Sequence, residues 1–153
     1  MYIDPSTEER FNRLLVDYLN TFNLLELNVG ICIRSMWDLK TRDADRKLER
    51  MNFDIKLEHL IKLAWNEQRS DLLAWTKAAH EKRHERNMYV HGIWACLPHL
   101  ERGVEFIVAP WMKAKYEAVY PGERFTLEVL EGIVQDIKSC FSELQSLRRK
   151  YGI

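Results

Sequence analysis

The stretch PSTEERFNRLLVDYLNTFNLLELNVGICIRSMWDL, residues 5–39, is one continuous amphipathic pattern. Its apolar side chains recur at spacings of three and four residues, the period of an α-helix; they are Phe11, Leu14, Leu15, Tyr18, Phe22, Leu25, Val29, Cys32 and Met36. Asp4 suits an N-cap and Pro5 a first helical position. We therefore expect one long helix of roughly 50 Å, long enough to pack against two neighbours or a second copy of the chain.

The rest of the sequence predicts three more helices. Residues 41–50 form a charged connector, and a second helix covers about 52–66. A third runs from about Gln68 to its natural stop at Gly92, and Thr126 is the expected N-cap of a last helix that ends in a basic run. We expect a single all-α domain over 1–153, bundle-like, with four helices.

An insertion separates the third and fourth predicted helices, at about residues 93–125. Three of the four prolines and three of the six glycines lie between Gly92 and Phe125. Residues 104–108 and 115–120 are rich in β-branched and aromatic side chains, so the sequence predicts a small β-hairpin or an irregular flap here.

The length, charge and cysteine content of the chain limit the classes of function that it can have. A chain of 153 residues makes one domain, and 23 basic residues balance 23 acidic ones, so a nucleic-acid partner requires a local basic patch. The three cysteines form no C-x-x-C pair, which favours a reducing compartment without disulfides or a thiolate zinc site. We expect a cytoplasmic protein, since the N-terminus is no signal peptide and no apolar run spans a membrane.

Residues 77–91, KAAHEKRHERNMYVH, differ from the rest of the chain in their density of histidines and cations. On a helical wheel Arg86 projects from the middle of the apolar arc. A buried charge costs several kcal/mol unless it is paired or has a task. Two interpretations stay open: a functional guanidinium, or an interior salt bridge to a carboxylate of another helix.

The opposite flank of the same helix carries a polar stripe of His80, His84, Asn87 and His91. Asn87 and His91 are four residues apart, so the amide can hydrogen-bond the imidazole and fix its tautomer. Arg86 and His91 are five apart, roughly 140° around a regular helix. They converge on one phosphate most readily if a second chain contributes, which suggests a composite site in a dimer.

Arg86 to His91 read R-N-x-x-x-H, followed by Gly92 and Trp94, at the end of the third predicted helix. This pattern resembles the HEPN superfamily, marked by an Arg, an adjacent polar residue and a His four to six positions beyond. The resemblance implies a homodimer whose two motifs line one cleft and cut RNA without metal or other cofactor, often in toxin–antitoxin or phage-defence systems. It also permits a cognate antitoxin protein as partner.

The resemblance assigns roles to three residues. His91 would be the general acid/base, Arg86 would stabilise charge on phosphate, and Asn87 would orient them. Neighbouring side chains would bind the RNA, with Trp94 able to stack a base; they are His80, Lys82, Arg83, His84, Tyr89 and Trp94.

Other interpretations compete with this one. His80 to His84 match H-E-x-x-H, the zinc motif of metalloproteases, but Lys82 and Arg83 place two cations beside the metal, and Val90 occupies the third-ligand place. A non-catalytic helical dimer that binds RNA, nucleotide or a protein partner is the main alternative to a ribonuclease. The histidines also suit a merely solvated helix face.

Overall fold

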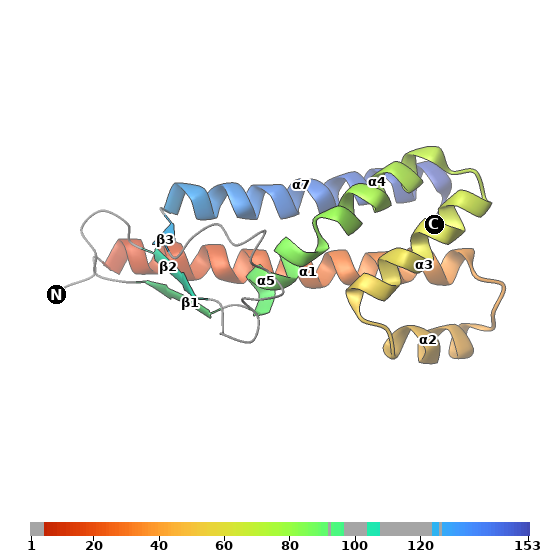
Figure 1. Cartoon of the computed structure of the whole chain (residues 1–153), viewed down its shortest axis with the longest axis horizontal. Helices are drawn as coiled ribbons and strands as arrows, with labels where there is room; N and C mark the ends of the chain where they lie inside the picture. Colours follow the sequence, from red (N-terminus) through yellow and green to blue (C-terminus); the bar gives the residue numbers. More distant parts are fainter. Residues whose placement is uncertain (1–4, 92, 97–103, 108–123, 126) are drawn as a thin grey trace. The chain divides into compact units, whose positions relative to one another are not determined.

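The structure is a computed structural model that describes residues 5–91, 93–96, 104–107, 124–125 and 127–153. Side chains are described over 5–87, 89–90 and 127–153. The described part is mainly helical, as the sequence predicts, and contains six helices (Figure 1). They are α1 (Pro5–Met36), α2 (Thr41–Glu49), α3 (Phe53–Asn66), α4 (Ser70–Glu81), α5 (Arg83–His91) and α7 (Leu127–Tyr151).

Three short strands lie between α5 and α7 in the sequence. They are β1 (Ile93–Cys96), β2 (Val104–Ile107) and β3 (Arg124–Phe125), and they form one antiparallel sheet in the order β1-β2-β3. Ile93 pairs with Ile107, and Val104 pairs with Cys96 on one side and Phe125 on the other. The expected strand at 115–120 lies outside the described residues.

Contacts divide the chain into two compact units. Unit 1 takes residues 1–22 and 84–138, and unit 2 takes residues 23–83 and 139–153. In the described part of unit 1, the first half of α1 lies beside the first half of α7 (Figure 1). Buried Phe11 and Leu130 form an apolar cluster there, against which three further side chains pack, those of Leu14, Leu15 and Leu127. The heptad-like apolar faces of both helices thus meet each other.

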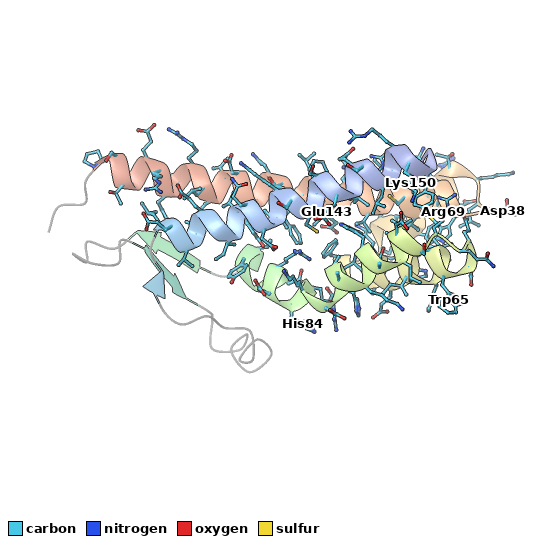
Figure 2. The ribbon with its side chains drawn as sticks, turned by 90° about the horizontal axis from the view of Figure 1, so that it is seen from above. Asp38, Trp65, Arg69, His84, Glu143 and Lys150 are labelled. Carbon is cyan, nitrogen blue, oxygen red and sulfur yellow. The ribbon has the colours of Figure 1, made fainter. Side chains whose placement is uncertain are left out.

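Among the residues whose side chains are described, unit 2 contains the larger set of fully buried aliphatic side chains, which include Leu25, Val29, Ile33, Leu57, Leu60, Leu72 and Leu144. Helix α3 begins where the sequence predicts, because the Asn52 side chain accepts a hydrogen bond of 2.9 Å from the backbone N–H of Ile55. The indole of buried Trp75 donates to the Cys140 carbonyl at 3.1 Å. Trp65, in contrast, is 67% exposed (Figure 2) and is not a core anchor.

Two helix predictions are wrong. The expected connector over 41–50 is helix α2, which buries Ala44 and Leu48. Two apolar residues four positions apart hold one face of this helix in the core, a pattern too short for periodicity to reveal. The expected continuous third helix is broken at Lys82 into α4 and α5, and the Arg83 guanidinium donates to the His80 carbonyl at 2.6 Å across the break.

None of the helices in the described ranges combines the length and the apolar character that crossing a membrane requires. Cys32 and Cys140 are both buried thiols. Burial raises the pKa of the Cys32 thiol from an ordinary 9.0 to about 11, against the lowering effect of Arg148 and Arg69.

This burial predicts slow thiol chemistry. A Cys96→Ser variant leaves only the two buried thiols, Cys32 and Cys140. We expect a disulfide reagent to modify them on the order of 100-fold more slowly in the folded protein than in the protein unfolded in urea, because the reaction requires the thiolate. The absorbance of the released reagent measures the rate. Stoichiometric labelling of the folded protein within the mixing time would contradict the described core.

Candidate functional site

The R-N-x-x-x-H motif occupies the last six residues of α5, in unit 1, directly before Gly92 and strand β1. Within unit 1, α1 contributes Tyr18 and α7 contributes Asp136 to the surroundings of α5. The side chain of His91 lies outside the described residues, as does that of Trp94; only the backbone is described at these two positions.

Arg86 is the best-defined member of the site. Its side chain is 5% exposed, and Nη2 lies 3.6 Å from Oδ2 of Asp136, whose side chain is 44% exposed. The interior ion pair, which the sequence leaves open as an alternative, is therefore present. Its geometry places the buried guanidinium inside and the carboxylate at the surface, so water solvates the anion better than the cation.

Two tyrosines pack beside this ion pair. The rings of Tyr18 and Tyr89 meet edge to face, with centroids 6.0 Å apart and an interplanar angle of 88°. Burial raises the pKa of the Tyr18 hydroxyl well above its ordinary value, although the nearby positive charge of Arg86 opposes the shift. Burial and then Glu85 raise the pKa of Tyr89 in the same direction. Both phenols are therefore neutral donors at physiological pH.

Tyr18 is a site residue that the sequence does not reveal. It falls on the apolar face of the first predicted helix, where it is indistinguishable from a core aromatic; only the position of Arg86 beside it marks it. Tyr18 is 3% exposed, and its buried hydroxyl has no hydrogen-bond partner within the described part of the chain. A buried polar atom without a partner costs about 1–3 kcal/mol.

Tyr18→Phe is therefore expected to raise the free energy of unfolding by about 1 kcal/mol, since the ring packing is retained and the unsatisfied hydroxyl is removed. Urea titration followed by circular dichroism measures the change, and Tyr151→Phe is the control at the far end of α7. A clear loss of stability in Tyr18→Phe would show that the hydroxyl has a partner that stabilises the fold.

The remaining predicted binding residues divide between the two units. His84, Asn87 and Tyr89 lie on α5 in unit 1, with His84 and Asn87 half-buried (His84 is labelled in Figure 2). Lys82 is exposed at the helix break. His80 and Arg83 belong to unit 2 and make structural contacts there.

His80 and Arg83 face α3. Nε2 of His80 lies 3.8 Å from a carboxylate oxygen of Glu58, and Nε of Arg83 lies 3.9 Å from Asp54. The Arg83 guanidinium also donates a hydrogen bond to the His80 carbonyl, where α4 ends and α5 begins. Both side chains thus hold the end of α4 in place within unit 2.

The H-E-x-x-H pattern does not form one helical turn. His80 belongs to α4 and His84 to α5, with Lys82 as the interruption. Among the residues whose side chains are described, no group of three or more His, Cys, Asp or Glu is placed to hold a metal ion. The continuous helical turn that zinc ligation by this motif requires is therefore interrupted between His80 and His84.

Comparison with protein-family models, with curated proteins and with solved structures finds no match to this chain.

Proposed function

We propose that the chain is a metal-independent endoribonuclease of HEPN type, active as a homodimer in which two R-N-x-x-x-H motifs share one cleft. The fold we propose is a bundle-like HEPN domain, in which α2 and the break between α4 and α5 add to the expected four helices, with an insertion at about 93–125. One observation supports the proposal above all: Arg86 is buried yet directed at the partly exposed Asp136, with Asn87 and His91 following on the same short helix.

The ion pair suits a catalytic guanidinium because it fixes its direction before substrate arrives. A charged donor held in place stabilises a transition state without reorganising at the moment of reaction. Asp136 and the Tyr18–Tyr89 pair are then positioning residues, which limit the rotamers of Arg86 by charge and by packing.

The proposed reaction is attack of a ribose 2′-hydroxyl on the adjacent phosphate. The imidazole of His91 removes the 2′-hydroxyl proton, the P–O5′ bond breaks, and the 5′-oxygen leaves with a proton, which the His91 of the partner subunit supplies. Arg86 stabilises the negative charge on the phosphorane oxygens, and the Asn87 amide orients the imidazole. The products are a 2′,3′-cyclic phosphate and a 5′-hydroxyl end.

A second candidate is a non-catalytic helical dimer that binds RNA, nucleotide or a protein partner through the same face. The contact between Arg86 and Asp136 favours it, since an interior ion pair stabilises a fold whether or not the protein catalyses a reaction. In either case we place the protein in a reducing cytoplasm, in keeping with the thiols of Cys32 and Cys140. A toxin or phage-defence role with a cognate antitoxin belongs to the first candidate.

A single assay separates the two candidates. Labelled RNA is incubated with the purified full chain in excess EDTA, the ends are analysed for cyclic phosphate, and light scattering gives the oligomeric state. Cleavage by a dimer supports the ribonuclease. Binding without cleavage favours the second candidate, and cleavage that EDTA abolishes would overturn the metal-independent mechanism.

A further inference from the structure

Two arginines of α2, Arg42 and Arg46, and its C-cap residue Arg50 differ from the other arginines whose side chains are described. Arg42, Arg46 and Arg50 make no side-chain hydrogen bond or ion pair within the described ranges. All the others have a partner: they are Arg10, Arg13, Arg34, Arg69, Arg83, Arg86, Arg148 and Arg149. Among the arginines whose side chains are described, those without a partner are thus concentrated on one short segment, residues 42–50.

The three guanidinium groups form one row. They are four residues apart, which places them along one ridge of α2 at intervals of about 6 Å. Ala44 and Leu48 are buried on the opposite side, so this ridge is the outermost part of the helix. We call it the α2 arginine row.

The row is unfavourable for α2 by itself. Like charges at i, i+4 destabilise a helix, and α2 has only nine residues and no side-chain hydrogen bond at its N-cap. The helix dipole favours cations in the last turn, but it opposes Arg42 in the first. An anionic ligand that bridges the row would remove this repulsion.

The surface beside the row is hollow and predominantly basic. An open groove of about 370 Å³ is lined by Asp43, Arg46, Lys47, Arg50 and Met51. Three cations therefore face one carboxylate along this groove. The nearby Asp45 is already engaged, 3.2 Å from Arg34, and does not neutralise the row.

An aromatic ring lies beside Lys47, one of the residues that line the groove. The Lys47 ammonium lies 4.9 Å from the centre of the Trp37 ring, and Trp37 meets His59 edge to face at 5.8 Å. Burial, followed by the positive charges of Lys47 and Lys62, lowers the pKa of His59. An indole beside a row of cations is the combination that single-stranded nucleic acids use, with bases stacked on the ring and phosphates on the cations.

We propose that the α2 arginine row, with Lys47 and Trp37, binds the phosphodiester backbone and bases of single-stranded RNA. The spacing of about 6 Å along the row is comparable with that of neighbouring phosphates in an extended strand. A membrane surface fits less well, since α2 exposes no large apolar side chain for insertion into lipid. This inference does not depend on the ribonuclease proposal, because the row belongs to unit 2 and the motif of α5 to unit 1.

The test measures binding to the full chain of a fluorescent 2′-O-methyl oligouridylate, which cannot be cleaved by 2′-hydroxyl attack. Arg42→Gln/Arg46→Gln/Arg50→Gln is expected to weaken binding on the order of 100-fold near 0.1 M salt and to reduce the log–log salt slope by about 2, as for three lost phosphate contacts. Circular dichroism should show an unchanged fold, because the three side chains contact nothing that holds the helix.

A matched triple variant tests whether the loss of affinity depends on the position of the cations or only on their number. Arg13→Gln/Lys138→Gln/Arg149→Gln removes the same number of cations at surface positions outside α2, and we expect its affinity to stay within about two-fold of the parent. Equal losses in the two triple variants would show non-specific attraction and overturn the proposal.

A separate variant tests whether bases stack on the indole of Trp37. Trp37→Leu is expected to weaken binding of the oligouridylate on the order of ten-fold and to leave binding of a double-stranded RNA unchanged, since paired bases cannot stack on the indole. Equal binding of oligouridylate by the parent and Trp37→Leu would exclude stacking. Binding of vesicles that contain phosphatidylserine, with no binding of RNA, would assign the row to a membrane and overturn the proposal.

Discussion

His91→Ala is expected to lower the rate of RNA cleavage on the order of 100-fold to 10,000-fold, the usual contribution of a general acid/base. The imidazole is the one group of the motif whose ordinary pKa, about 6.5, lets it both accept and donate a proton near neutral pH. Position 91 is the last residue of α5, where loss of the side chain costs little helical stability. Single-turnover cleavage of a labelled RNA gives the rate.

His84→Ala is the matched control for this prediction. His84 lies on the same helix, is half-buried and carries the same side chain, but it is outside the motif. With protein at saturating concentration, we expect its cleavage rate to stay within a few-fold of the parent, because a residue that only binds RNA changes the affinity and not the chemical step. A pH profile adds a second readout, because the limb that depends on an imidazole should disappear in His91→Ala alone. Equal activity of His91→Ala and the parent protein would remove the basis of the proposed function.

Asp136→Ala is expected to destabilise the protein by about 3 kcal/mol, because it leaves the buried guanidinium of Arg86 without its carboxylate. Arg86→Met should lower the free energy of unfolding by only about 1 kcal/mol or less. The apolar side chain fills the buried site, and water solvates the remaining carboxylate of Asp136. The asymmetry follows from the exposures of the two side chains, 5% for Arg86 and 44% for Asp136. Urea titration of both variants measures it.

Two controls accompany this pair. Asp17 forms an ion pair with Lys138, and both side chains are more than 40% exposed. Asp17→Ala should therefore lower the free energy of unfolding by at most about 1 kcal/mol. The double variant Arg86→Met/Asp136→Ala should recover most of the stability that Asp136→Ala loses. Equal destabilisation by Arg86→Met and Asp136→Ala would contradict the described burial.

Arg86→Met also separates the two proposed functions. The variant is expected to stay folded, so its activity reports on the guanidinium itself. Loss of one charge-stabilising donor should lower cleavage on the order of 100-fold to 1,000-fold. Full activity of a folded Arg86→Met protein would leave Arg86 with the structural role alone.

The candidate site was only partly predictable. The wheel of residues 77–91 correctly places Arg86 on a buried face, and it leaves open what the charge contacts. Asp136 is about fifty positions away in sequence, and its spacing on α7 resembles that of any solvated carboxylate. Tyr18 is hidden in the same way, because a core aromatic and a tyrosine beside a guanidinium have the same periodicity. Local sequence patterns predict which face of a helix is buried, but they do not predict which side chains of other helices it contacts.

The sequence by itself determined the elements whose signals are local. The long period of residues 5–36 predicts α1, Asn52 predicts the start of α3, and the apolar face after Thr126 predicts α7, because periodicity and capping act within a few turns. Tertiary structure decided the rest. Helix α2 exists because Ala44 and Leu48 are buried in unit 2, and the break at Lys82 exists because Arg83 contacts the His80 carbonyl and Asp54. The contact of Arg83 with Asp54 joins positions that no local propensity connects, and the burial of Ala44 and Leu48 determines the outward direction of the α2 arginine row.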